Sequence, residues 1–341
     1  MKNHNLDFDT ITLGHGSGGE LTRELLDAIV FKTFSNPILD QKHDGAMVKL
    51  NGEIAISTDS FVITPIFFKG GNIGSLSVHG TVNDVAMCGA IPQYLSLSFI
   101  IEEGLKTDEF ISIVKSIKNA ADESGVQIVT GDTKVVNRGK GDKIFINTTG
   151  FGKIHPNADI SVHRIKAGDK ILVNGFIAQH GMAIMSEREG LEFESTIESD
   201  STNLNFLVQD LLSDFGTDIK LFRDPTRGGL GTVLHEISND ISKGVFLKEN
   251  DIPLEKQVAA ACEMLGLDPM YVANEGLMLM IVDPKIEVRA LELMRAHPKG
   301  KNAASIGTIT NEHPNKVVME SPIGGKRIVS PLIGEQLPRI C

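Results

Sequence analysis

A glycine-rich loop near the start of the chain places the tightest limit on its fold. Residues 14–19 read Gly-His-Gly-Ser-Gly-Gly, a literal G-x-G-x-x-G between a short apolar run and a predicted helix over 20–30. In a dinucleotide-binding fold, this fingerprint needs a strongly apolar strand before it and a second parallel strand after the helix. The segment that should form that second strand, 32–42, is polar and contains Pro37. We therefore reject the dinucleotide-binding fold.

The same loop is not a P-loop, because Glu20 stands where that motif requires lysine. Successive backbone N–H groups of a glycine-rich loop can still bind a phosphate without help from side chains. The loop alone leaves two interpretations open, a phosphate-binding loop and a flexible turn.

Helical and strand patterns alternate along both halves of the chain. In 107–124, apolar residues recur at helical spacing, and Thr107 with Glu109 marks the helix start. The patterns predict further helices over 20–30, 75–89, 178–189, 204–215, 229–242 and 255–265, and strands within 53–68 and over 93–101, 126–130, 143–153, 170–174, 245–248, 276–282 and 304–309. The polar stretch 192–203 predicts an exposed loop.

The length of the chain predicts two domains. A sequence of 341 residues is long for one domain and sufficient for two cores. The His-Pro-Asn run at 155–157 is the expected boundary. We predict an N-terminal domain over 1–155, a C-terminal domain over 156–330 and a tail over 331–341. The tail should be extended, because prolines at 331 and 338 interrupt regular structure.

Composition limits the classes of function. A net charge of −11 opposes binding to nucleic acid, where lysine and arginine must neutralise phosphates. The chain has neither a run of about twenty apolar residues that could span a membrane nor an N-terminal targeting pattern. Its three cysteines, Cys88, Cys262 and Cys341, are far apart, which fits a reducing compartment. We expect a cytoplasmic protein that binds neither nucleic acid nor membrane, with Cys88 and Cys262 in the core.

Four short motifs in the first half each place an aspartate beside small residues, at the expected end of a strand or helix. They are His43-Asp44-Gly45-Ala46, Ser57-Thr58-Asp59-Ser60, Val82-Asn83-Asp84-Val85-Ala86 and Thr130-Gly131-Asp132-Thr133-Lys134. Mg²⁺ prefers carboxylate oxygens together with nucleotide phosphates. One such motif is more often a turn or a helix cap, but four favour a metal-nucleotide site.

The second half adds two loops and a terminal thiol. The run 223–229, Arg-Asp-Pro-Thr-Arg-Gly-Gly, precedes a predicted helix and could bind an anion or simply cap the helix. Glu275 lies in a loop before an apolar strand, where both catalytic carboxylates and ordinary turns occur. Cys341 could be an ordinary chain end, but an exposed free thiol is usually avoided unless it is used.

Taken together, these motifs resemble the HypE family of hydrogenase maturation factors. Members are carbamoyl dehydratases of the superfamily of aminoimidazole ribonucleotide synthetase, selenophosphate synthetase and thiamine-monophosphate kinase. The resemblance covers essentially the whole chain and rests on the motifs at 15–19, 82–86, 131–135, 224–229 and 274–276 and on the ending Pro-Arg-Ile-Cys at 338–341.

The resemblance implies an α+β fold of two domains, in which the N-terminal domain forms a β-barrel across a homodimer and ATP binds near that interface. It assigns nucleotide binding to Gly16, Gly18, Gly19, Asp44, Asp59, Asn83, Asp84 and Asp132. Within this set, Mg²⁺ would be held by Asp44, Asp59, Asp84 and Asp132. Relatives often carry two acids where His43 and Asp44 stand.

The reaction that the resemblance implies is carried on Cys341. A carbamoyltransferase, HypF, would load a carbamoyl group onto this thiol, and ATP-dependent dehydration would convert it to a thiocyanate. The cyanide would then pass to iron on a HypC–HypD complex and so to NiFe hydrogenase. Glu275 is the expected general base, and Lys134 would position the carbonyl oxygen or stabilise charge on the phosphorylated intermediate. Two alternatives remain, a small-molecule kinase or synthetase with an incidental tail, and a nucleotide-gated scaffold without catalysis.

Overall fold

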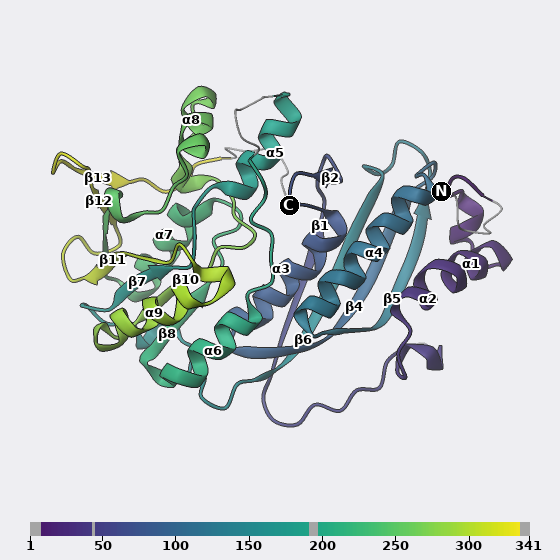
Figure 1. Ribbon diagram of the computed structural model, residues 1–341, viewed down its shortest axis with the longest axis horizontal. Helices are drawn as coiled ribbons and strands as arrows, with labels where there is room; N and C mark the ends of the chain where they lie inside the picture. Colours follow the sequence, from purple (N-terminus) through teal and green to yellow (C-terminus); the bar gives the residue numbers. More distant parts are fainter. Residues whose placement is uncertain (1–7, 43–44, 191–196, 335–341) are drawn as a thin grey trace.

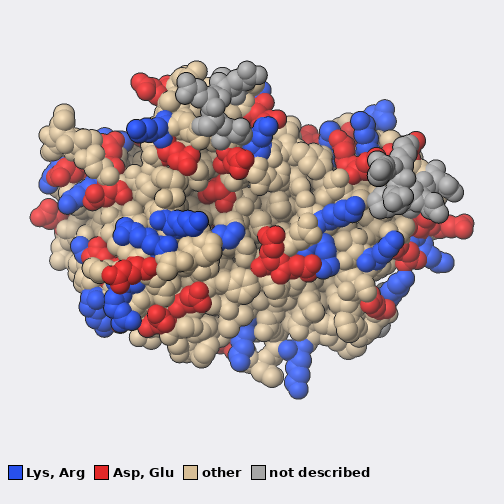
Figure 2. All heavy atoms as spheres, in the orientation of Figure 1, with Lys and Arg blue, Asp and Glu red and all other residues tan. Residues whose placement is uncertain are grey.

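The computed structural model describes residues 8–42, 45–190 and 197–334. Two β-sheets lie side by side along the long axis of the molecule, each with helices packed against it (Figure 1). The smaller sheet comes from the first half of the chain and the larger one from the second half. The α+β class and the two-domain organisation predicted from the sequence are therefore confirmed. Figure 2 shows acidic and basic side chains interspersed over the face seen in Figure 1.

The first sheet has four strands in the order β1-β6-β4-β5. These strands are β1 (Ile54–Phe61), β4 (Ala90–Glu102), β5 (Gln127–Val136) and β6 (Ile144–Ile154). The edge strand β5 runs parallel to β4, while β6 pairs antiparallel with both β1 and β4. A two-stranded hairpin, β2 (Phe67–Phe68) and β3 (Gly71–Asn72), leads into the first long helix.

Helices α3 (Ile73–Met87) and α4 (Thr107–Ser124) cover one face of this sheet (Figure 1). The helix α4 is amphipathic and buries one side only. By contrast, every residue of α3 except Ser75 and Asp84 is buried. The reason is that α3 packs against the first sheet and also against α6 (Asn205–Phe215) of the second domain, where Ala86 and Met87 join the core. Both domains therefore share α3.

The N-terminal segment packs along the edge strand β5 (Figure 1). A 3₁₀ turn (Leu13–Gly16) precedes α1 (Glu20–Leu25), a π-helical stretch (Leu26–Phe31) and α2 (Lys32–Phe34). Asn36 joins this segment to the sheet, because its Nδ2 donates to the carbonyl of Ile128 over 2.8 Å. The helix predicted over 20–30 is confirmed.

The second sheet has seven strands in the order β13-β12-β9-β11-β7-β10-β8. They are β7 (Lys170–Val173), β8 (Ile219–Arg223), β9 (Gly244–Lys248), β10 (Leu279–Val282), β11 (Ala304–Thr310), β12 (Val317–Glu320) and β13 (Lys326–Val329). One core layer contains α6 and α9 (Glu287–Ala296), and the other contains α5 (Gln179–Glu189), α7 (Gly229–Ile241) and α8 (Lys256–Leu265). Apolar helices cover both faces of the sheet at β10, which lies between β7 and the edge strand β8, and this strand is fully buried.

Most predicted elements are confirmed, and α4 has the predicted bounds. Three predictions are wrong. The described part of the expected exposed loop, 197–203, is packed into the domain junction, with Ile197 and Asn203 buried. Cys88 is exposed at the end of α3, whereas Cys262 is buried as predicted. The strand over 126–130 continues to Val136, so Asp132 lies within a strand and not at its end. The sequence analysis also missed β8, α9, β12 and β13.

Among the described residues, no helix is long and apolar enough to cross a membrane. The division of the chain at residues 155 and 330 falls after β6 and after β13, and we keep it as a proposal.

Candidate active site

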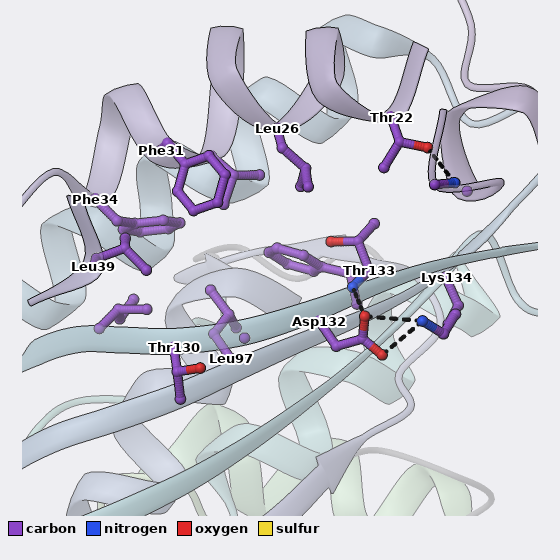
Figure 3. Close-up of a pocket in the computed structure, with 16 residues that line it drawn as sticks. Thr22, Leu26, Phe31, Phe34, Leu39, Leu97, Thr130, Asp132, Thr133 and Lys134 are labelled. Carbon is purple, nitrogen blue, oxygen red and sulfur yellow. Dashed lines mark hydrogen bonds and ion pairs between the residues drawn. The ribbon is translucent and has the colours of Figure 1, made fainter. Parts of the chain in front are cut away.

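A cavity of about 210 Å³ lies between the N-terminal helical segment and the edge strand β5 (Figure 3). We call it the strand-edge pocket. Its walls are largely apolar and include Leu26, Phe31, Phe34, Leu39, Leu97, Phe99 and Ile128. Polar groups gather at one end, where Gly16 and Gly18 face the segment 130–134. An apolar slot with a glycine-lined polar end fits a purine base continuing into phosphates.

Close packing explains why glycine stands at two positions of this pocket. A Cβ on Gly16 would lie 2.6 Å from the backbone nitrogen of Val135, and a Cβ on Gly131 would lie 2.0 Å from the carbonyl oxygen of Leu97. Thr22 supports the loop, because its Oγ1 accepts the N–H of Gly18 over 2.9 Å. The loop therefore approaches β5 closely enough to present backbone N–H groups beside Lys134.

Asp132 and Lys134 form an ion pair at the polar end of the pocket (Figure 3). The Lys134 Nζ lies 2.9 Å from the Asp132 Oδ2, and the Asp132 Oδ1 accepts the N–H of Thr133 over 2.8 Å. The hydrogen bond from Lys134 lowers the pKa of Asp132, and burial opposes it weakly. Both side chains are at least 60% exposed, so both are open to a ligand.

A second group of acids lies where α3 meets the second domain. We call Asp59, Asp84, Asp224 and Glu275 the interdomain acid cluster. Asp84 is the only acid of α3, and its Oδ2 accepts the hydroxyl of Ser57 over 2.6 Å. Asp224, which precedes α7, is hydrogen-bonded to Asp84. Burial and then the charge of Asp84 raise the pKa of Asp224 well above its ordinary value. Asp224 therefore favours its protonated form, which can donate the hydrogen bond to Asp84.

Asp59 extends this cluster along β1. Burial raises the pKa of Asp59, and the nearby charge of Asp84 adds to the shift, while Arg227 opposes it. Carboxylates held together at the cost of an extra proton are what a cation site presents when a proton replaces the cation. Among residues 8–42, 45–190 and 197–334, no three histidine, cysteine or acidic side chains are arranged to hold a metal ion by themselves. Mg²⁺ at this cluster would therefore need phosphate oxygens as further ligands.

Glu275 is the most enclosed acid of the cluster, with a side chain only 5% exposed. Burial raises its pKa well above the ordinary value, and the neighbouring charges of Asp200, Asp224, Asp59 and Asp84 raise it further. Its Oε2 lies 3.8 Å from where a Cβ on Gly80 would stand, so the carboxyl group faces α3. A carboxylate whose pKa is raised is a stronger proton acceptor than an ordinary one, which suits a general base.

Asp200 orients Glu275. Its Oδ1 accepts the N–H of Glu275 over 3.1 Å, and its Oδ2 accepts the N–H of Gly276 over 3.0 Å. A Cβ on Gly276 would lie 1.8 Å from the carbonyl oxygen of Asp200, so only glycine allows this contact. Burial raises the pKa of Asp200 to about 6, against the effect of these hydrogen bonds. The sequence analysis missed Asp200, because its polar surroundings are typical of a surface loop.

The remaining predicted residues differ in their surroundings. Asn83 is buried and joins the domains, since its Nδ2 donates to the carbonyl of Thr202 and its Oδ1 accepts the N–H of Leu204. Gly18 has a φ of +83°, which favours glycine, and Gly19 precedes α1. Asp44 and Cys341 lie outside the described residues.

The strand-edge pocket and the interdomain acid cluster are separate within one chain. Pairing aligns Asp59 with Thr148, Thr148 with Leu97, and Leu97 with Gly131. Three strand spacings of about 4.8 Å put roughly 14 Å between the backbones of Asp59 and Gly131. Asp59 and Asp132 therefore cannot bind one ion in one chain, but a nucleoside triphosphate has the length to bridge such a distance.

The two domains define a class of protein. Residues 42–154 match the AIR synthase related protein N-terminal domain family, and residues 166–320 match the corresponding C-terminal domain family.

Within this class, full-length relatives identify the family. Carbamoyl dehydratase HypE from Azotobacter vinelandii is 48% identical over 342 residues, which cover 100% of both chains. The crystal structure of hydrogenase maturation protein HypE in complex with ATP matches with a TM-score of 0.94 and 46% identity, covering 97% of this chain and 100% of that one. A HypE–HypF complex matches with a TM-score of 0.80 and 43% identity, covering 92% of this chain and 100% of that one. The chain belongs to the HypE family.

Proposed function

We propose that this protein catalyses the ATP-dependent dehydration of a carbamoyl group carried on Cys341, and that the resulting thiocyanate supplies cyanide for the iron of NiFe hydrogenase. The observation that carries this proposal is Glu275, a buried carboxyl group with a raised pKa beside the hydrogen-bonded acids Asp84 and Asp224. Phosphoryl transfer to a small molecule needs an acidic cation site, whereas dehydration also needs a group that takes protons from nitrogen. The HypE relatives and the ATP complex of one of them support the same reaction.

The proposed reaction balances as follows. Protein–S–C(=O)–NH2 and ATP give protein–S–C≡N, ADP and inorganic phosphate. The C–O bond breaks, both N–H bonds break, and the nitrile forms, so the elements of water end up in the phosphate product. When bound, Mg²⁺–ATP supplies the phosphoryl group that makes the carbamoyl oxygen a leaving group.

Different residues of the chain would bind the phosphates and hold Mg²⁺. We propose that Gly16, Gly18 and Gly19 hold the phosphates through backbone N–H groups, with the base in the apolar slot. Asp44, Asp59, Asp84 and Asp132 would bind Mg²⁺ ions along the triphosphate, with Asp59 and Asp132 on different ions, and Asp224 would join Asp84 by releasing its own proton. Asn83 would keep α3 and Asp84 in place beside the nucleotide.

Two residues would act on the carbamoyl group itself. We assign to Lys134 the positioning of the carbonyl oxygen, since its ammonium group is exposed at the polar end of the pocket. Glu275 would accept the protons of the nitrogen, with its backbone held by Asp200. Both roles require Cys341 to reach the region between the pocket and the acid cluster.

We further propose a homodimer that completes the site. The face of the first sheet opposite α3 and α4 exposes apolar side chains, including Ile54, Ile56 and Ile100, which are 43–57% exposed. Pairing of two such faces into a β-barrel would bury them. Sedimentation at micromolar concentration tests this proposal, which predicts a dimer in the wild type and a monomer in Ile56→Asp.

The expected partners are HypF, which would load Cys341, and a HypC–HypD complex, which would receive the cyanide. A relative has been crystallised as a HypE–HypF complex, which supports the first of them. The expected location is the cytoplasm, since the three cysteines show no pattern of disulfide pairing.

One experiment separates this function from its alternatives. Phosphate release is measured with ATP before and after the protein is loaded by a HypF-type carbamoyltransferase. The dehydratase should release one phosphate per loaded chain and almost none unloaded. A small-molecule kinase would release phosphate without loading but with its own substrate, and a scaffold would release none in either state.

A further inference from the structure

The chain leaves the core of the second domain at Val329. This residue ends β13, is buried, and packs in the domain core. Ser330 is exposed, and Pro331 follows it. Because proline lacks an N–H and restricts the preceding residue to extended conformations, β13 cannot continue past this point. Val329 and Ser330 are therefore the root of the segment that ends in Cys341.

Two side chains hold the backbone of this root. The Tyr271 hydroxyl donates to the carbonyl oxygen of Ser330, and the His235 Nε2 donates to the carbonyl oxygen of Val329. His235 is only 7% exposed. Both contacts are to backbone carbonyl oxygens, so they hold the path of the backbone whatever side chains residues 329 and 330 carry.

Both side chains come from one surface of α7 and the turn beside it. The ring of Tyr271 packs on Gly231, where a Cβ would lie 2.7 Å from the tyrosine Cε1. His235 follows Gly231 by four residues and so lies on the same helix face. A third link, from Arg327 of β13 to Asp268, spans 3.5 Å and joins the strand to the same turn.

The turn that holds the root also leads into the catalytic loop. Tyr271 precedes Glu275 by four residues, which span at most about 14 Å. The segment from 331 to 341 has eleven residues and can span at most about 40 Å. A tail that starts at this root can therefore reach Glu275 and can also extend away from the molecule.

We propose that Tyr271 and His235 are positioning residues that anchor the root of the tail and so set the effective concentration of Cys341 at Glu275. This inference rests on the proposed function. Release of the root would free Val329 and Ser330 and lengthen the tether from 11 residues to 13. Since effective concentration falls with about the −3/2 power of tether length, the intramolecular reaction should slow about 1.3-fold from length alone. Loss of direction would slow it further.

The test compares reaction in cis with reaction in trans. In the cis arm, loaded full-length protein reacts with ATP in a single turnover. In the trans arm, the same protein with Cys341→Ser turns over a synthetic S-carbamoyl peptide of sequence 331–341. Tyr271→Phe removes only the hydroxyl group and keeps the ring on Gly231. It should slow the cis reaction by more than about 1.3-fold, through length and direction together, and leave the trans reaction unchanged.

Further variants and a structural readout strengthen the test. His235→Leu should slow the cis reaction like Tyr271→Phe, whereas His235→Gln, which keeps a donor, should restore the rate. Ser305→Ala removes a hydroxyl group that bonds Glu287 elsewhere in the domain and serves as the control. Trypsin should cleave after Lys326 and Arg327 faster in Tyr271→Phe than in the control.

The possible failures differ. An unchanged cis reaction in Tyr271→Phe, or an equal loss in both arms, overturns the anchor while the dehydratase stands. A wild-type protein that releases no phosphate in either arm overturns the proposed function, and the positioning role fails with it.

Discussion

The strand-edge pocket and the interdomain acid cluster differ in what surrounds their carboxyl groups and in how those surroundings shift the pKa. Asp132 is 60% exposed and paired with Lys134, which lowers its pKa. Asp224 and Glu275 are buried among other acids, which raises their pKa. The first region presents fixed charges to a ligand, whereas the second stores protons that a cation or a substrate can displace. Small neighbouring residues in the sequence do not indicate whether an acid is exposed with a lowered pKa or buried with a raised one.

The largest effect should follow from Glu275→Gln, which removes the proton acceptor but keeps the shape. Loss of a general base typically costs between about 10²-fold and 10⁴-fold in rate. Single-turnover phosphate release from the loaded protein measures this loss. The matched control is Glu292→Gln on the exposed side of α9, which should react at the wild-type rate. A Glu275→Gln protein within a factor of three of wild type would remove Glu275 from the mechanism.

Asp84→Asn and Asp132→Asn test whether both regions serve one reaction. Each should reduce ATP-dependent turnover by about 10²-fold, as expected for the loss of one electrostatic contact to the reacting groups. Both should unfold at the wild-type temperature, because neither change empties a core. Activity is measured over a Mg²⁺ titration with Asp214→Asn, on α6, as the control. Full activity of either variant at ordinary Mg²⁺ would separate that region from catalysis.

Gly16→Ala tests the close approach of the glycine-rich loop to β5. The added Cβ would stand 2.6 Å from the nitrogen of Val135, so the loop must shift away from the phosphates. We expect ATP affinity to fall about tenfold, or about 1.4 kcal/mol, by titration calorimetry. Gly175→Ala, where a Cβ meets nothing within 4 Å, should bind ATP normally. Equal affinity of both variants would show that the loop does not hold the nucleotide.

The smallest effect concerns Asp200→Asn and the pH dependence of turnover. A base works when it is deprotonated, so turnover should rise with pH through the raised pKa of Glu275. Burial is the main cause of that raised pKa, and the charge of Asp200 is the next. Removing this charge should lower the pKa of Glu275 and move the rising limb to lower pH. A shift to higher pH, or none, would contradict the proposed coupling.

The same variant has a stability signature whose sign can be worked out. The pKa of Asp200 is about 6 when folded and 3.8 ordinarily, so the folded state favours its proton. The unfavourable contribution of Asp200 to the free energy of unfolding is therefore absent below about pH 4 and complete above about pH 6. Between these values, wild type should lose stability relative to Asp200→Asn by up to about 3 kcal/mol. Urea unfolding at several pH values measures this difference.

The spacing of apolar residues predicts those helices that bury one face only. Helix α4 buries one face, so its apolar spacing predicts its bounds. Helix α3 is buried on nearly all sides, so its pattern reveals a helix but not that two domains share it. The core position predicted for Cys88 was wrong for the same reason. The sequence around the end of α3 looks uniformly apolar, but that end lies at the surface.

The candidate site was predicted in its residues more than in its arrangement. The acidic motifs around Asp59, Asp84 and Asp132 are visible in sequence, but the three strand spacings between Asp59 and Asp132 depend on the order β1-β6-β4-β5. Asp200 was missed because its hydrogen bonds to the loop of Glu275 join residues 75 positions apart. No local signal reports such a contact.

The central claim is that the group transformed is carried on Cys341. The most direct test is the intact mass of the protein after incubation with a HypF-type carbamoyltransferase and its carbamoyl donor, followed by ATP. We expect the protein mass to rise by one carbamoyl group on Cys341 and then to fall by one water when ATP is added. Neither change should occur in Cys341→Ser. A loaded protein whose mass does not fall with ATP, or loading that persists in Cys341→Ser, would contradict it.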